Sequence, residues 1–182
     1  NPQTIIFRPG KTILGAGKTM DFTNRESAVG KSALVEHLFA IEGVKGVFLG
    51  EDFLSITKAE KQDWIILKAE ILGLLLEYFS TNRPILNADE SNDTTKHAKE
   101  HFDQADHAIV EQIKELLETR IRPAVARDGG DITFHGFEAG VVYLTMRGAC
   151  AGCPSSTYTL KMGIENMLRH YIPEVSEVRA TA

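Results

Sequence analysis

The sequence has 182 residues, of which 43% are hydrophobic and 25% are charged, a balance typical of a soluble globular protein. Its formal net charge is −5 and its basic residues are scattered, so no broad positive surface is expected to attract nucleic acid or anionic lipid. The most apolar segment, residues 64–79, contains three charged residues and is shorter than the roughly 20 apolar residues that span a bilayer. We therefore expect no nucleic-acid partner and no membrane partner, and no signal peptide is recognisable at the N-terminus.

Residues 1–86 are predicted to form the first of two small domains. The runs TIIFR (4–8) and KTIL (11–14) are typical of short strands, and a Pro-Gly turn separates them. Apolar residues at helical spacing predict a helix within residues 32–43.

The rest of this domain is predicted to contain a hairpin and a longer helix. VKGVFLG and FLSITK are strand-like runs separated by Glu51 and Asp52. Asp63 occupies the N-cap position of a helix that ends near Phe79. That helix is apolar on most faces. We therefore expect the sheet to cover one face, and the other half of the protein is a candidate to cover another.

Residues 87–107 are predicted to form an acidic linker. They hold six acidic residues and two lysines but almost no large aliphatic residue. Such a segment buries too little apolar surface to offset the entropy lost on ordering.

Residues 108–182 are predicted to form the second domain. Ile109, Ile113, Leu117 and Ile121 repeat at helical spacing, and Pro123 is expected to end that helix. The segment RDGGD (127–131) is typical of a turn, because glycine readily takes a positive φ. A hairpin (ITFHGF and VVYLTMR), a helix from Pro154 to about Tyr171 and a short last strand (EVSEVRA) follow. The expected fold class is α+β, with two small α/β sandwich domains joined by a polar linker.

Two familiar patterns are interpreted as having no function. GAGKT (15–19) lacks the glycine that a phosphate-binding P-loop needs five positions before its Gly-Lys pair. His97 and His101 are spaced like two ligands on one helix face, but they lie in the linker and are interpreted as solvated. No catalytic set of serine, histidine and aspartate is recognisable from spacing.

The chain's two cysteines, Cys150 and Cys153, lie together in the stretch MRGACAGCPSS (146–156). A lone C-x-x-C pair indicates metal or redox chemistry in a reducing compartment rather than a disulfide scaffold. The pair precedes a helix predicted to begin at Pro154, where the positive end of the helix dipole favours thiolates. The sequence therefore predicts an accessible thiolate site.

Three interpretations of this pair remain open from the residues alone. In the first, the thiols bind no ligand and have no function. In the second, they act as a thiol-disulfide oxidoreductase. In the third, two chains each supply two thiolates to one metal centre. Only about ten residues follow Tyr171, too few for the further strands and helix of a thioredoxin-like fold. A symmetric dimer would supply the four ligands that either an iron–sulfur cluster or a structural zinc needs.

Two longer stretches give the chain a family resemblance. RPAVARDGGDI (122–132) and GACAGCPSSTYTLKMGIENML (148–168) closely resemble the C-terminal domain of NifU, the module shared by Nfu-type iron–sulfur proteins. NPQTIIFRPG, MDFTN and LFAIEGVKGVFLGEDFLSITK resemble the N-terminal domain found with it in the Nfu subgroup. The resemblance covers nearly the whole chain except the linker.

The resemblance implies a scaffold or carrier without enzymatic activity. Its cargo would be a [4Fe-4S] cluster shared between two subunits and passed to apo-proteins, with Cys150 and Cys153 at the family's ligand positions for metal and cofactor. The implied partners are apo iron–sulfur recipients, upstream assembly proteins and a second copy of the chain when the cluster is loaded. A bacterial cytoplasm and a mitochondrial matrix are both compatible with this function. A zinc-bridged dimerisation module and a thiol-disulfide oxidoreductase are the alternatives.

Overall fold

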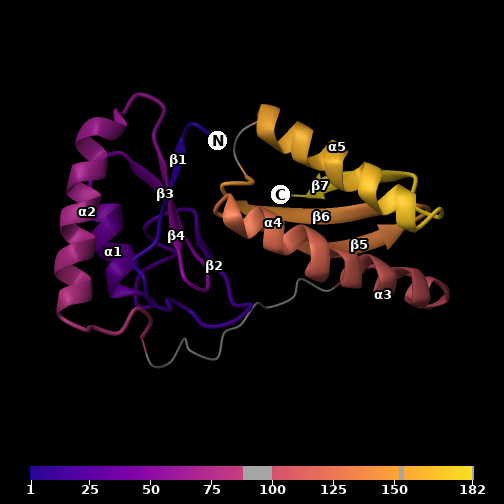
Figure 1. The fold of residues 1–182 in the computed structure, drawn as a ribbon, viewed down its shortest axis with the longest axis horizontal. Helices are drawn as coiled ribbons and strands as arrows, with labels where there is room; N and C mark the ends of the chain where they lie inside the picture. Colours follow the sequence, from indigo (N-terminus) through magenta and orange to yellow (C-terminus); the bar gives the residue numbers. More distant parts are fainter. Residues whose placement is uncertain (88–99, 152–153, 182) are drawn as a thin grey trace. The chain divides into compact units, whose positions relative to one another are not determined.

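The computed structural model describes residues 1–87, 100–151 and 154–181, and for residues 154–156 it describes the backbone alone. The chain divides into two compact units, one over Pro2–Lys96 and one over His97–Ala182, and each has its own sheet and helices (Figure 1). The predicted α+β class is confirmed, while the predicted domain boundaries stay a prediction.

The first unit is a four-stranded antiparallel sheet with its two helices on one side (Figure 1). The strand order is β1-β4-β3-β2, and the predicted hairpin forms its central pair. The strands and helices are β1 (Thr4–Phe7), β2 (Met20–Phe22), α1 (Ala33–Ala40), β3 (Val44–Leu49), β4 (Leu54–Lys58) and α2 (Trp64–Ser80).

One predicted strand is wrong and one strand was not predicted. Residues 11–14 are irregular, because the backbone N–H groups of Ile13 and Leu14 both donate to the Glu51 carbonyl instead of joining the sheet ladder. The outer place beside β3 is taken by β2, a three-residue strand too short for a periodic sequence pattern.

Helix α2 begins at the predicted cap, since the Asp63 carboxylate accepts a hydrogen bond from the Ile65 N–H at 2.8 Å. Its inner face is part of the core of this unit. The outer face remains exposed within the unit, although it is also apolar, so the sheet covers only one side of the helix. The buried residues of α2 are Leu67, Ile71, Leu75 and Tyr78.

The second unit begins with a longer helical segment than the sequence predicted. Helix α3 (His107–Leu116) continues through a π-helical turn, Leu117–Ile121, into α4 (Arg122–Arg127). Pro123 was expected to end the helix, and this prediction is wrong. Because Pro123 lies in the first turn of α4, its missing N–H removes no hydrogen bond that this helix needs.

The sheet of the second unit has the order β5-β6-β7, with β5 (Gly130–Glu138) antiparallel and β7 (Glu177–Thr181) parallel to β6 (Val141–Gly148). Helix α5 (Pro154–Tyr171) joins β6 to β7, as a parallel pair requires. The apolar faces of α3, α4 and α5 form one core with alternate residues of β6, namely Val142, Leu144 and Met146.

The described end of the predicted linker contacts the second unit. The backbone N–H of His101 donates to the His135 carbonyl at 3.1 Å, and its carbonyl accepts from Phe137 at 2.8 Å. Glu100 forms an ion pair of 2.6 Å with Lys114 of α3. Residues 88–99 lie outside the described residues.

Across the described ranges, every helix is too short or too polar to cross a membrane.

Truncating the inner face of α2 should destabilise the first unit far more than truncating the outer face. Ile71 is fully buried, so Ile71→Ala should lower the free energy of unfolding by about 2–5 kcal/mol. Ile65 is 81% exposed, so the matched change Ile65→Ala should cost no more than about 0.5 kcal/mol. Because Trp64 is the chain's single tryptophan, its fluorescence during denaturant unfolding reports on this unit. Equal effects of the two variants would contradict the described orientation of α2.

Candidate metal centre

Cys150 lies in a tight turn directly after β6. Its backbone N–H donates to the Arg147 carbonyl at 3.3 Å, and the next N–H, of Ala151, donates to the Gly148 carbonyl at 3.1 Å. Gly148 has a φ of 60°, in the left-handed region that favours glycine. The hydroxyl of Thr157, in the first turns of α5, donates to the Cys150 carbonyl at 3.1 Å. These three hydrogen bonds therefore hold the backbone of Cys150 and Ala151 at the end of β6.

The Cys150 side chain is buried in the core of the second unit, with 6% of its surface exposed. It packs directly on Gly130, the first residue of β5. A Cβ atom at Gly130 would overlap Cys150 Sγ and would lie 2.7 Å from the Arg147 carbonyl oxygen and 2.8 Å from the Cys150 nitrogen. The absence of a side chain at Gly130 thus creates the space that the thiol fills.

This environment favours the neutral thiol of Cys150. Burial raises its pKa to about 12, and the negative charges of Asp128 and Asp131 act in the same direction. The expectation of an accessible thiolate is therefore wrong for Cys150, because its side chain is buried in the core and burial disfavours the charged form. Because the pKa of Cys150 is higher in the folded state than in the unfolded state, the fold favours the protonated thiol. This contribution to the free energy of unfolding is complete below the ordinary thiol pKa and is lost as the pH rises toward 12.

Cys153, the other predicted ligand, lies outside the described residues, so the structure places only Cys150. Among the described side chains, no group of three or more histidine, cysteine, aspartate or glutamate residues could hold a metal ion. His101 is exposed, and its proposed companion His97 also lies outside the described ranges.

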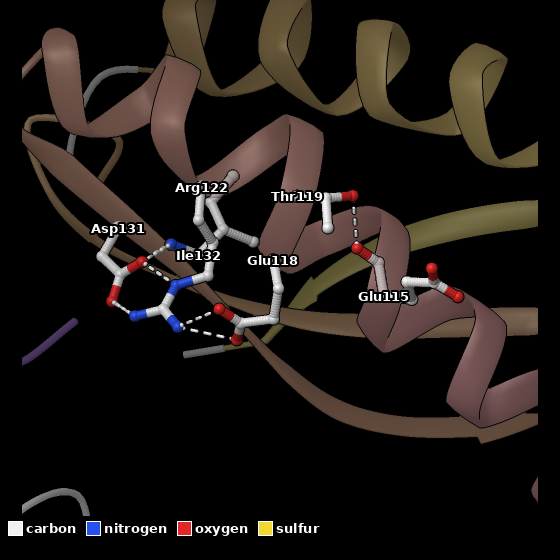
Figure 2. Close-up of polar contacts among 6 residues, drawn as sticks. All are labelled: Glu115, Glu118, Thr119, Arg122, Asp131 and Ile132. Atoms are coloured by element: carbon white, nitrogen blue, oxygen red, sulfur yellow. Dashed lines mark hydrogen bonds and ion pairs between the residues drawn. The ribbon is translucent and has the colours of Figure 1, made fainter.

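An ion-pair network that the sequence did not reveal joins Glu118 and Arg122 of the helical segment to Asp131 of β5 (Figure 2). The Asp131 side chain is only 4% exposed and accepts two hydrogen bonds from Arg122, from Nε at 2.8 Å and from Nη2 at 3.0 Å. Arg122 Nη1 also donates to both carboxylate oxygens of Glu118, at 2.7 and 2.8 Å. The hydrogen bond to Asp131, partly offset by burial, raises the pKa of Arg122 above its usual range.

This network fixes the strand that supports the thiol. Asp131 Oδ1 also accepts from the Ile132 N–H at 2.8 Å, so the carboxylate ties Arg122 of α4 to the start of β5. Gly130, whose bare backbone receives Cys150, is the preceding residue. The only sequence signal was the nine-residue separation of arginine and aspartate in RPAVARDGGD, which spans a helix end and a turn and has no local periodicity.

Adding a methyl group at Gly130 should push Cys150 out of its pocket. Overpacking costs about 1–3 kcal/mol, so in a Cys153→Ser background Gly130→Ala should speed alkylation of Cys150 by iodoacetamide about fivefold or more. Mass spectrometry of the modified peptide measures this rate.

The matched control for this prediction is Gly163→Ala. A Cβ atom there has no other atom within 4 Å, so the alkylation rate should not change. An unchanged rate in the Gly130→Ala protein would show that the thiol does not depend on this contact.

Removing the charge of Arg122 should destabilise the second unit, because a buried carboxylate would lose its partner. Arg122→Met should lower the free energy of opening of β5 and β6 by about 3–5 kcal/mol. Hydrogen–deuterium exchange of their backbone amides measures this. Arg179→Met is the control, since its two hydrogen bonds to Glu177 lie at the surface and their loss should change the exchange of these amides far less. Similar losses in both variants would contradict the structural role of Arg122.

Two family models match the chain in succession. Residues 1–82 match the model "Scaffold protein Nfu/NifU N terminal", and residues 113–179 match the "NifU-like domain". Two solved structures also show similarity. A NifU-like protein from Saccharomyces cerevisiae shares 25% identity, with coverage of 48% of this chain and 78% of that one and a TM-score of 0.43. A Staphylococcus aureus protein shares 20%, with coverage of 41% and 87% and a TM-score of 0.37.

Curated relatives match along almost the whole chain. The "NFU1 iron-sulfur cluster scaffold homolog, mitochondrial" of Drosophila sechellia is 48% identical over 178 residues, 98% of this chain and 61% of that protein. "NifU-like protein 5, mitochondrial" of Arabidopsis thaliana is 47% identical, with coverage of 98% and 64%. The chain thus spans about three-fifths of the length of these relatives. The two successive matches and these relatives confirm the resemblance, and the chain belongs to the Nfu/NifU scaffold family, with an N-terminal Nfu domain followed by a NifU-like domain.

Proposed function

We propose that this protein is a non-enzymatic carrier of a [4Fe-4S] cluster and passes this cargo to apo-proteins. Two chains would hold the cluster, each through Cys150 and Cys153. The observation that carries the proposal is the position of the chain's only two cysteines inside the matched NifU-like domain, residues 113–179. The coordination by two chains and the transfer step go beyond that match.

The number of available ligands supports a shared centre. An iron–sulfur cubane is held by four thiolates, and one chain has two cysteines. In the described ranges no other group of metal-ligating side chains gathers to complete the set. A symmetric pair of chains supplies the missing two thiolates with no further residue.

The burial of Cys150 gives the proposal a conformational step. In the described conformation its sulfur faces Gly130 and the core, so it must leave this pocket to bind iron. Leaving the pocket exposes apolar surface and costs free energy, which lowers the affinity for the cargo. When a recipient cysteine replaces Cys150 on an iron atom, the recipient thiol loses its proton to solvent, and the displaced Cys150 sulfur takes up a proton and returns to the pocket as the neutral thiol. One iron–sulfur bond breaks and one forms, so no oxidation or reduction is required.

The charges around the loop are expected to restrain the affinity further. Asp128 and Asp131 disfavour added negative charge at Cys150, whereas the start of α5 at Pro154 favours it. Arg122 neutralises Asp131 through two hydrogen bonds and so limits the repulsion. The repulsion from the two aspartates weakens cluster binding, and the attraction of the helix start strengthens it. Together they would give an intermediate affinity, which suits a scaffold that must release its cargo.

We propose a mitochondrial location, in the matrix, rather than the bacterial cytoplasm that the sequence left open. The curated relatives that match 98% of the chain carry mitochondrial names. The proposed partners are apo iron–sulfur proteins that receive the cluster, assembly proteins that supply it and a second copy of the chain in the loaded state.

Anaerobic reconstitution with iron and sulfide tests the proposal. We expect a dimer that contains about four irons, the content of one cubane held by four thiolates. Cys150→Ser and Cys153→Ser should each abolish iron binding and leave the second unit folded, which hydrogen–deuterium exchange of the β5 and β6 amides checks because Trp64 reports on the first unit. The measurement is native mass and iron content on the same anaerobic sample.

His101→Ala is the control for ligands outside the C-x-x-C pair, and its iron content should equal that of the unchanged protein. A loaded monomer would contradict the shared centre. One tightly bound zinc per dimer without iron would favour the zinc-bridged module, and rapid reduction of insulin disulfides without metal would favour the oxidoreductase.

A further inference from the structure

The outer face of α2 in the first unit is apolar and uncovered by its own sheet. Ile65, Leu72 and Leu76 follow the spacing i, i+7 and i+11, so they lie on one face of the helix, whereas Ile66 lies on the neighbouring exposed flank, four residues before Glu70. Their exposed fractions are 81%, 41%, 72% and, for Ile66, 68%. Contiguous apolar surface of this kind on a folded unit marks an interaction site.

The apolar face leads into a groove between the C-terminal half of α2 and the end of β1. The groove has a volume of about 470 Å³. Leu72, Leu76 and Phe79 line one side, and Phe7 and Pro9 line the other. The groove therefore offers space into which apolar side chains of a partner could insert.

Positive charges border this groove. Lys68 shares a helix face with Leu72, Leu75 and Phe79, at the spacing i, i+4, i+7 and i+11. Lys11 Nζ lies 5.0 Å from the centre of the Phe79 ring and donates to the Phe79 carbonyl at 3.1 Å.

Arg8 lines the groove itself and forms a salt bridge of 3.1 Å with Asp52, which partly offsets its charge. The acidic residues of α2, Glu70 and Glu77, lie at the spacing i and i+7 on the other flank, together with Gly73. The side of the helix that faces the groove is therefore positive, and the opposite side is negative.

We propose that this groove binds an amphipathic helix of a partner protein, with apolar residues in the groove and acidic residues against Lys68 and Lys11. The stretch from Ile65 to Leu76 covers about three helical turns, or roughly 16 Å, which matches the length of a short recognition helix. Amphipathic helices bind apolar grooves through anchors at this spacing. The inference concerns the first unit alone and goes beyond the proposed cluster-carrier function, because it needs neither cysteine.

Two synthetic peptides test the proposal with the full chain. Each has about 18 residues, with leucines at i, i+4, i+7 and i+11, and they differ only in flanking residues that are glutamate in one and lysine in the other. Fluorescence anisotropy of labelled peptide measures binding. We expect the glutamate peptide to bind at least tenfold more tightly than the lysine peptide, with a smaller difference at high salt.

Variants on the two flanks of α2 make the test specific. Leu76→Glu should weaken binding of the glutamate peptide at least tenfold, and Lys68→Glu should reverse the preference between the two peptides. Glu70→Lys, the matched charge reversal on the opposite flank, should leave the preference unchanged. All three substituted positions are exposed, and Trp64 fluorescence checks that the first unit of each variant is folded.

Four outcomes would overturn the proposal. Equal binding of both peptides would remove the role of charge, and binding unaffected by Leu76→Glu would place the site elsewhere. If neither peptide binds and Leu76→Glu converts a dimer to a monomer in sedimentation, a second copy of the chain covers this face. If neither peptide binds and the mass does not change, the chain's own second unit or nothing at all occupies it.

Discussion

The contact between the Cys150 thiol and the bare backbone of Gly130 is the constraint on which the candidate metal centre depends. It requires a residue without a side chain at the first position of β5, and it requires that strand to be held in place. The second requirement is met by Asp131, whose buried carboxylate joins Arg122 of α4 to the start of the strand. The environment of the proposed ligand therefore has three parts, namely the Cys150 sulfur, Gly130 and the ion pair of Arg122 with Asp131.

The local features of the fold were predictable, since their causes lie within a few residues. Asp63 caps α2, and the hairpin of β3 and β4 follows the run of apolar residues on both sides of Glu51 and Asp52. The predicted secondary structure was wrong where the backbone hydrogen bonds depend on residues far away in the sequence. Residues 11–14 look like a strand, but their N–H groups bond to Glu51, some forty residues further along.

The helix after the C-x-x-C pair was predictable, while the environment of Cys150 was not. The pair predicted two sulfur ligands, and this stays a prediction, whereas the helix that follows begins at Pro154 as expected. The burial of Cys150 depends on Gly130, twenty residues earlier, and on the core around it, so no reading of the neighbouring residues predicts it. The same holds for Arg122 and Asp131, which a helix end and a turn separate in sequence and which only the folded backbone brings to 2.8 Å.

The π-helical turn at Leu117–Ile121 has a consequence for how this chain can vary in length. In an α-helix each residue turns the chain by about 100°, so deletion of a single residue before Arg122 that kept the π-helical pairing would rotate everything that follows it relative to α3. The guanidinium of Arg122 would then point away from β5, although its identity and its neighbours in sequence were preserved. The spacing of the residues in this stretch is therefore constrained as strictly as their chemical nature, and a shortened relative would need another anchor for the strand beneath its cysteine.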